Sequence, residues 1–221
     1  MILVLNGPYW FRGFDAILGI LFALITFLIA AVSYKAYKIT EEKKYSYFSV
    51  SFFLMSLAFF LTGIFEVFLT THVWDLLSQW LSQFDLVFLA HMLLIFLAYV
   101  SLLIITLKIT DRKVIALLFS LILLFTLFSY QYYLKFHIIS FLLLFFLSYQ
   151  FYTNYLEKKQ FNAKLVFIAF YLLTCAEVFF LAIMYDQVLY VVGALLQLLG
   201  YILLFYVFVQ VVYHGGTKRK T

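Results

Sequence analysis

Seven long apolar stretches constrain the fold of this 221-residue chain more than any other feature of its sequence. A helix needs about 20 apolar residues to cross the hydrocarbon core of a bilayer, and all but the fourth stretch reach that length. They predict an all-α, polytopic membrane protein: a single transmembrane domain over residues 1–221 that folds as a seven-helix bundle. The helices are expected at residues 13–34, 45–70, 85–107, 114–129, 136–155, 165–185 and 188–212.

The composition excludes a soluble domain and a nucleic-acid partner. Hydrophobic residues make up 67% of the chain and charged residues 11%, whereas a soluble domain carries about 25% charged residues. The net charge of +5 comes from basic residues in the short connections between apolar stretches. No basic stripe interleaves with aromatic residues on a polar surface, as nucleic-acid binding would require. The partner that the composition predicts is the lipid bilayer.

The basic residues predict how the helices are oriented. If consecutive spans are antiparallel, four clusters lie on one side of the membrane and only Arg12 and Lys135 lie on the other. Cytoplasmic loops carry such an excess of positive charge, so we expect a multi-pass protein of the cell membrane with its N-terminus outside and its C-terminus in the cytoplasm. The clusters are Lys35, Lys38, Lys43 and Lys44; Lys108, Arg112 and Lys113; Lys158, Lys159 and Lys164; and Lys218, Arg219 and Lys220.

Tyrosines near the expected helix ends agree with these borders. Tyr133 and Tyr190 lie at the outer ends of their helices, and Tyr34 lies at an inner end. Amphipathic rings prefer the depth of the lipid head groups. The tyrosines are therefore interpreted as membrane anchors.

Two parts of the sequence echo each other. Ser33-Tyr34 followed by Glu42-Lys43-Lys44 has a counterpart in Ser148-Tyr149 followed by Glu157-Lys158-Lys159. An internal repeat would consist of residues 13–107 and 136–212, joined by the helix at 114–129, in a 3+1+3 arrangement. Because the connector is one helix, both halves would have the same orientation, related by an axis along the membrane normal. The alternative is chance similarity between helices rich in leucine and aromatic residues. Further echoes pair residues 51–55 with 169–173 and 97–100 with 199–202.

Four polar residues interrupt the apolar stretches and are the main candidates for a site. A charged side chain at the bilayer centre costs about 2.5–3.5 kcal/mol on insertion scales, so such residues usually face other helices and serve a function. With the predicted topology, all four lie at similar depths and would line one pocket in the outer half of the bundle. They are Glu66, His91, Glu177 and Gln197, and secondary candidates near the outer helix ends are Asp15 and Asp85.

Small residues indicate which way two of these side chains point. Glu66 shares its helical face with Gly63, and Gln197 shares its face with Gly193 and Gly200. Small residues mark helix contacts in membranes, so both polar groups are expected to face a neighbouring helix. The functional interpretation is a pocket for a solute, proton or cation, in which Glu66→Gln and Glu177→Gln alter transport or ligand response but not expression. The alternative is that these groups only form hydrogen bonds between helices.

Enzymatic chemistry, cofactors and metals find no support in the motifs. The chain has no G-x-S-x-G, no Walker loop and no G-x-G-x-x-G, so we expect neither an enzyme nor a cofactor. Glu66, His91 and Glu177 are ligand types that zinc or iron would accept. The four histidines lack any H-x-x-x-H spacing, however, and no metal site is predicted. Cys175 is the only cysteine, which excludes an intrachain disulfide.

The seven-helix, 3+1+3 arrangement resembles the SWEET and PQ-loop transporters. The resemblance implies a small-solute or proton-coupled transporter with its site between the halves. The prolines of those families are missing, since the only proline, Pro8, precedes the first span. Microbial rhodopsins also have seven helices, but the last span here, residues 188–212, contains no lysine to bind retinal.

A second resemblance leads to a different function. Residues 34–38 (Tyr-Lys-Ala-Tyr-Lys) and 47–55 are similar to segments of membrane input modules in prokaryotic, especially archaeal, sensor proteins. This resemblance implies a stand-alone membrane sensor or interaction subunit that signals through a partner protein or forms a homo-oligomer. Transport and sensing therefore both remain open at this point.

Overall fold

A computed structural model describes residues 8–70, 82–127 and 132–217, and all regular elements in these ranges are helical. The prediction of an all-α fold with seven long helices is confirmed. The 3-10 helices are η1 (Tyr9–Phe11) and η3 (Ala182–Met184). The long helices are α1 (Arg12–Thr40), α2 (Lys43–Thr70), α4 (Ser82–Thr106), α5 (Arg112–Leu127), α6 (Tyr132–Lys158), α7 (Phe161–Leu181) and α8 (Val188–Thr217).

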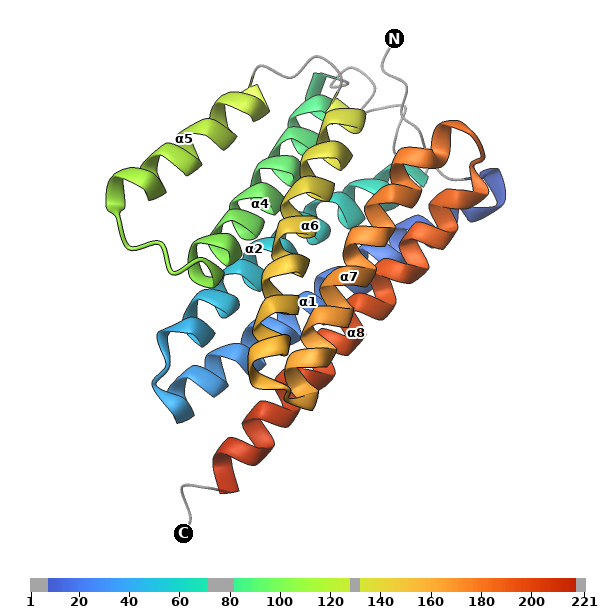
Figure 1. Ribbon diagram of the computed structural model, residues 1–221. Helices are drawn as coiled ribbons and strands as arrows, with labels where there is room; N and C mark the ends of the chain where they lie inside the picture. The colour runs from blue at the N-terminus through green and yellow to red at the C-terminus, as the bar shows by residue number, and fades with distance from the viewer. Residues whose placement is uncertain (1–7, 71–81, 128–131, 218–221) are drawn as a thin grey trace.

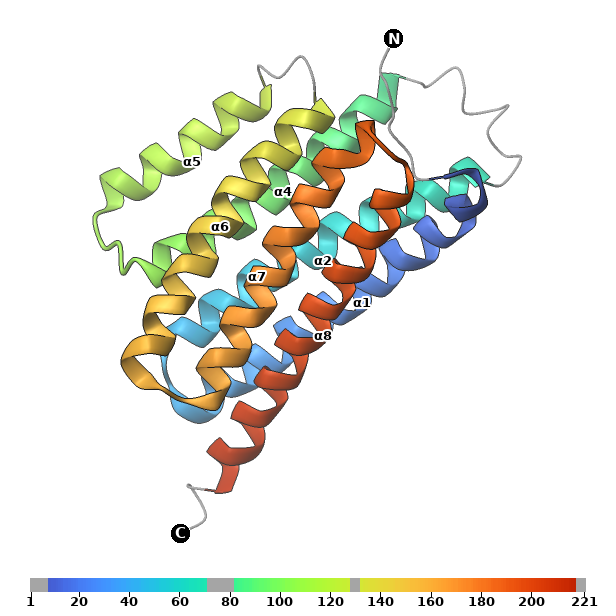
Figure 2. The same ribbon diagram turned by 45° about the vertical axis from the view of Figure 1, so that its right-hand side comes forward.

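Six of the long helices form a closed ring, and α5 lies outside it (Figures 1 and 2). Going round the ring, α1 packs on α2, α2 on α4, α4 on α6, α6 on α7, α7 on α8, and α8 on α1. Helices that follow one another in the chain run antiparallel (Figures 1 and 2). The ring places residues of α4, α6, α7 and α8 around a common interior, where the candidate site lies.

The same six helices are long and apolar enough to cross a membrane, and the chain is therefore a multi-pass membrane protein. The exception, α5, has 16 residues and spans about 24 Å at 1.5 Å per residue, less than the hydrocarbon thickness of about 30 Å. Helices α4 and α6 nevertheless run in the same direction in both views, so the chain returns along α5 from one end of the bundle to the other (Figures 1 and 2).

Several helices continue beyond the predicted apolar spans. Helix α1 reaches Thr40, α6 covers residues 132–158, and α8 reaches Thr217. Hydropathy detects only the part of a helix that lies in the hydrocarbon core. The helix itself continues into the head-group region until a residue leaves the helical backbone conformation. Helix α1 ends where Glu41 adopts a left-handed φ of 58°, and α6 ends before Lys159 at φ 49°, a conformation that stops a helix.

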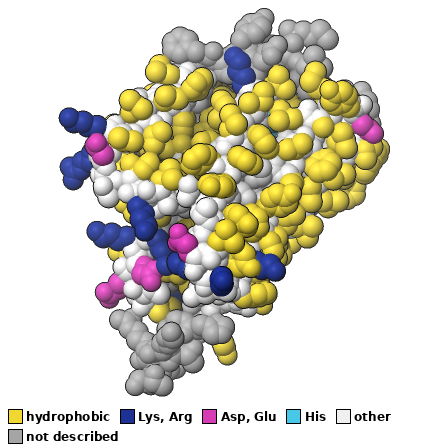
Figure 3. Space-filling view, in the orientation of Figure 1, with side chains coloured by type: hydrophobic (Ala, Val, Ile, Leu, Met, Phe, Trp, Pro, Cys, Tyr) yellow, Lys and Arg dark blue, Asp and Glu magenta, His cyan; other side chains and the backbone are white. Residues whose placement is uncertain are grey.

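One end of the bundle is rich in positive charge. The turns between α1 and α2, α4 and α5, and α6 and α7 all lie at this end, as does the C-terminal end of α8 (Figures 1 and 2). Most of the Lys and Arg side chains visible in Figure 3 gather at this end, to the lower left. Three of the four predicted clusters thus share one end, here called the basic end; residues 218–220 lie outside the described residues. Which side of a membrane the basic end faces stays a prediction.

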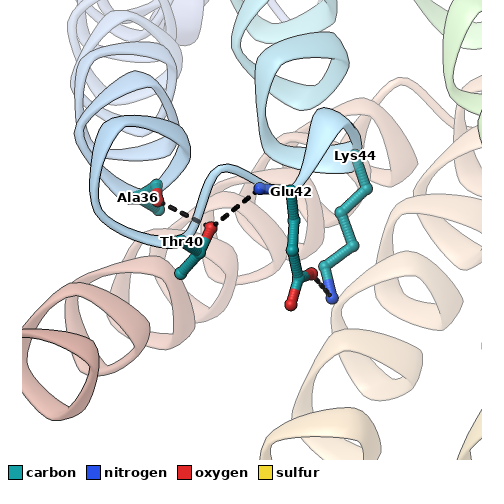
Figure 4. A network of polar contacts seen from close by, with 4 residues as sticks. All are labelled: Ala36, Thr40, Glu42 and Lys44. Atoms are coloured by element: carbon teal, nitrogen blue, oxygen red, sulfur yellow. Dashed lines mark hydrogen bonds and ion pairs between the residues drawn. The ribbon is translucent and has the colours of Figure 1, made fainter. Parts of the chain in front are cut away.

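The α1–α2 turn at the basic end is closed by short-range polar contacts (Figure 4). The Thr40 hydroxyl donates to the carbonyl of Ala36 at 2.9 Å and accepts from the backbone N–H of Glu42 at 3.4 Å. The Glu42 carboxylate forms an ion pair with Lys44. This pairing engages Lys44, and the four lysines of the cluster still outnumber the two carboxylates Glu41 and Glu42.

The residues of the predicted repeat show matching burial. Ser33 and Ser148 are both buried, and Tyr99 and Tyr201 are both almost inaccessible. Extending the two alignments places Phe22 and Phe59 opposite His137 and Glu177. Phe22 and Phe59 contact each other at 5.4 Å between ring centroids. Gene duplication itself stays a prediction, since helices packed in a ring share burial patterns for other reasons too.

Helices α1 and α2 come into close backbone contact at two glycines, Gly19 and Gly63. A methyl group added to Gly63 would lie 3.0 Å from the backbone nitrogen of Ile20 and 3.1 Å from the carbonyl carbon of Gly19. Backbone atoms cannot yield without moving a helix, so the contact requires glycine. The prediction that Gly63 faces another helix is confirmed.

We therefore expect Gly63→Ala to destabilise the protein by about 1–3 kcal/mol, as overpacking does in a close-packed interior. Thermal unfolding of the purified protein in detergent micelles measures the effect. Gly13→Ala is the matched control, because a methyl group there meets nothing within 4 Å and should leave stability unchanged or slightly raised. Equal unfolding temperatures for the two variants would contradict the close contact.

Candidate functional site

A buried histidine–glutamate pair joins α6 and α7. The Nδ1 atom of His137 lies 2.7 Å from the Oε2 atom of Glu177, and the residues are 7% and 4% exposed. A contact this short needs a proton between the two atoms, carried by one or the other. His137 follows Tyr132 by five residues, about 8 Å along α6, so the pair lies in the half of the bundle away from the basic end.

Aromatic rings enclose this pair. The ring of His137 is 4.4 Å from that of Tyr133, 4.9 Å from Phe136 and 5.1 Å from Phe180, measured between centroids. The Tyr133 hydroxyl donates to the carbonyl of Phe180 at 3.2 Å. Tyr133 thus packs on the pair and ties α6 to α7, a role beyond the anchoring inferred for it. Low polarity around the pair strengthens the attraction between opposite charges there.

His91 on α4 is buried and points toward α2. Its Nδ1 atom lies 3.0 Å from the carbonyl oxygen of Ala58. A carbonyl can only accept, so Nδ1 carries the proton of this bond and Nε2 is the remaining site for a second proton. The ring of Phe136 lies 5.5 Å from His91 and also packs on His137. The two histidines therefore both contact one phenylalanine at the contact between α4 and α6.

Two carboxylates form a separate polar group near the α1–α2 glycine contact. The Oε2 atom of Glu66 would lie 3.8 Å from a methyl group on Gly19. Asp15, one turn earlier on α1, lies beside Tyr190 of α8 and is close enough to influence Glu66 electrostatically. One carboxylate oxygen of Asp15 is buried and has no hydrogen-bond partner among the described residues. This group sits where α1, α2 and α8 meet.

Gln197 lies on the face of α8 that packs against α7. A methyl group on Gly193 would lie 2.9 Å from the ring of Phe180, and one on Gly200 would lie 2.9 Å from Leu173. The prediction that this glycine face contacts a neighbouring helix is confirmed. One turn beyond Gln197, Tyr201 is fully buried. Its hydroxyl lies close to Gln197 and to Tyr99 of α4, without a well-aligned hydrogen bond to either.

The structure distributes the predicted site residues over neighbouring groups. His91 and Glu177 both belong to the group around His137, and Gln197 lies next to it through Tyr201. Glu66 lies instead with Asp15 at the α1–α2 contact. The side chain of Asp85 lies outside the described residues.

His137 is the residue that the sequence interpretation missed. It stands close to the end of its apolar stretch, where a histidine resembles an interfacial residue. The signal was present in the spacing: His137, Ser140, Leu144, Leu147 and Phe151 recur every three or four residues, and all are buried. A histidine that shares a stripe with core residues faces other helices.

No three His, Cys, Asp or Glu side chains gather closely enough to hold a metal ion within residues 8–70, 82–127 and 132–217. Of the three residues with suitable ligand chemistry, His91 and Glu177 belong to the group around His137, whereas Glu66 lies with Asp15. The arrangement is instead suited to exchange of protons, because two histidines and a carboxylate lie close together in an apolar interior.

Comparison with known proteins adds no assignment: no family model, no curated protein and no solved structure matches this chain.

Proposed function

We propose that this multi-pass membrane protein is a proton-coupled transporter of a small solute in the cell membrane, and that the His137–Glu177 pair carries the coupled proton. The observation that supports the proposal is the buried 2.7 Å contact between Nδ1 and Oε2. Ionisable residues inside membrane helices are costly and usually belong to ion or substrate pathways. Transport, rather than a chemical reaction on a substrate, is the activity that such a pair serves here.

The charge states of the pair explain how a proton would drive a conformational change. With one ionisable proton shared between them, an imidazolium beside a carboxylate or a neutral imidazole beside a carboxylic acid has no net charge. One more proton gives a net charge of +1, and loss of the shared proton gives −1. Either charge is unfavourable among Phe136, Phe180 and Tyr133, so the site must admit water or a counter-charge.

The position of the pair explains how a change of its charge could move the helices of the six-helix ring relative to one another. His137 and Glu177 lie on α6 and α7, whose predicted counterparts α1 and α2 carry Phe22 and Phe59 instead. Phe136 contacts both His137 and His91, and so links α6 to α4 across a contact between the predicted halves. Rocking of one half against the other is how repeat-built transporters expose a site alternately to the two sides.

Reconstitution tests the proposal directly. The purified chain is placed in liposomes that contain a pH-sensitive dye, with an imposed pH gradient. The panel of added solutes comprises a neutral sugar, a zwitterionic amino acid, an organic cation and an organic anion. We expect at least one solute to move protons in protein-containing liposomes and not in empty ones. Absence of solute and proton movement for the whole panel would overturn the proposal.

The alternative function is a membrane sensor or interaction subunit, and one feature of α8 favours it. The C-terminal end of α8 extends beyond the other helices at the basic end (Figures 1 and 2). A projecting helix can pass a change inside the bundle to a partner protein. In that case the liposomes show no flux, but a spin label placed on the exposed Tyr213 changes its mobility when the pH is varied.

A further inference from the structure

A shallow apolar groove runs along the outer contact between α1 and α2. It has a volume of about 260 Å³ and is lined by Phe27, Ala30, Ala31, Tyr34, Ser49, Val50 and Phe53. The Ser49 hydroxyl donates to the carbonyl of Ala30 at 2.9 Å, so the polar atoms of the floor are satisfied internally. Three of the seven lining residues are small, Ala30, Ala31 and Ser49, and the other four carry larger side chains. The groove therefore offers apolar surface and little hydrogen bonding.

The groove leads toward three lysines at the basic end. On α1, Lys35 follows Ala31 by one turn and Lys38 follows Tyr34 by one turn, so both continue the face that lines the groove. On α2, Lys43 precedes Val50 by two turns and shares its face. The Lys38 ammonium lies 5.0 Å from the centroid of the Tyr34 ring, which places this charge at the mouth of the groove.

Positive charge predominates in this part of the chain, where the four residues Lys35, Lys38, Lys43 and Lys44 outnumber the two carboxylates Glu41 and Glu42. Of these two carboxylates, Glu42 forms an ion pair with Lys44. Among the described residues, no ion pair involves Lys35, Lys38 or Lys43. An apolar groove with positive charge at its mouth is complementary to an anionic amphiphile. The lysines would bind the charged head group, and the groove would bind the apolar chain that follows it.

We infer that the α1–α2 groove is a binding site for an anionic phospholipid, whose head group contacts Lys35, Lys38 and Lys43 and whose acyl chain lies along Ala30 and Ala31. Basic clusters next to a membrane helix attract anionic lipids by about 1 kcal/mol per residue, and each buried methylene of a chain adds hydrophobic stabilisation. Neither contribution alone would select one lipid at one position. The combination at a single groove does, and it is independent of the transport activity proposed above.

Lipid competition on the whole purified chain tests this inference. The probes are phosphatidylglycerol and phosphatidylcholine with identical acyl chains, and native mass spectrometry measures their relative retention. We expect the wild type to retain phosphatidylglycerol preferentially. In the triple variant Lys35→Gln, Lys38→Gln and Lys43→Gln, this preference should fall by at least about ten-fold. Ala31→Phe, which fills the groove at an exposed position, should reduce retention of both lipids.

The α6–α7 turn supplies the matched control, because its Glu157-Lys158-Lys159 sequence repeats that of the α1–α2 turn. Lys158→Gln with Lys159→Gln removes charge from the same end and should leave the lipid preference of the wild type intact. If this control loses the preference for phosphatidylglycerol equally, general surface charge explains the preference, and the proposed lipid site is refuted. Unchanged lipid retention in Ala31→Phe would also refute the proposed lipid site. Efficient cross-linking of two copies through Ala31→Cys would refute it too, because it would show that a second copy of the chain occupies the groove.

Discussion

His137→Phe is expected to destabilise the protein more than replacement of both members of the pair by His137→Phe and Glu177→Met. The single variant leaves a buried carboxylate without its partner, which typically costs about 3–5 kcal/mol. The double variant replaces both groups by apolar side chains of similar size, and such replacements are often neutral or stabilising. The counterpart positions of the predicted repeat already hold an apolar pair, Phe22 and Phe59, in ring contact.

A double-mutant cycle tests this expectation by measuring the coupling energy between His137 and Glu177. The four proteins are the wild type, His137→Phe, Glu177→Met and the double variant, and their unfolding is followed in mixed micelles of increasing denaturing detergent. Neutral hydrogen bonds between membrane helices contribute at most about 1.7 kcal/mol in such cycles. We expect a larger coupling energy, which would identify an ion pair. A coupling energy below that limit would show a neutral hydrogen bond and weaken the case for a charged pair at the site.

Glu177→Gln is expected to abolish proton coupling while the fold is retained. The glutamine amide can still form a hydrogen bond with Nδ1 of His137, since it both donates and accepts, but it cannot take up a proton. Solute-driven proton movement in proteoliposomes should therefore fall to the level of empty liposomes. Transport that remains should no longer depend on pH, because the group that binds the proton is gone.

Two substitutions separate this effect from a general loss of charge. Glu157→Gln removes an exposed carboxylate at the basic end and should leave proton coupling as in the wild type. Glu66→Gln removes a carboxylate from the separate group with Asp15; it should change the transport rate while its pH dependence persists. Full proton coupling in Glu177→Gln would assign the proton to another group and refute the proposed role of the pair.

Hydropathy predicted the fold well because the bilayer imposes one length and one polarity on every spanning helix. The seven helices, their antiparallel order and the shared end of three basic clusters all follow from that constraint. The closed ring and the place of α5 outside it did not follow from sequence. Both depend on the shape of the side chains at each helix contact, such as the close backbone approach at Gly63. They also depend on which apolar residues face lipid and which face protein, and these two kinds of residue look alike in sequence.

The candidate site was partly predictable for the same reason. Glu177 and His91 stand out because polar residues are rare in apolar helices, and both lie in the interior. Their partners could not be predicted, since the rotation of each helix decides which side chains meet. Glu66 and Glu177 have similar depths by residue count, yet they face different neighbours. His137, the partner of Glu177, was hidden by its place near a helix end.

The position of α5 bears on how such a bundle could be assembled from parts. Helix α5 packs on α4 outside the ring and contributes the buried Ile122 to the core, but it is not one of the six helices that close the ring. What α5 does is return the chain to the end of the bundle where α6 begins, so that α4 and α6 run in the same direction (Figures 1 and 2). Two separate three-helix chains, each inserted in the same orientation, would need no such return. If the halves arose by fusion of identical subunits, α5 is the segment that fusion required, and co-expressed fragments cut on either side of it should still find each other in the membrane.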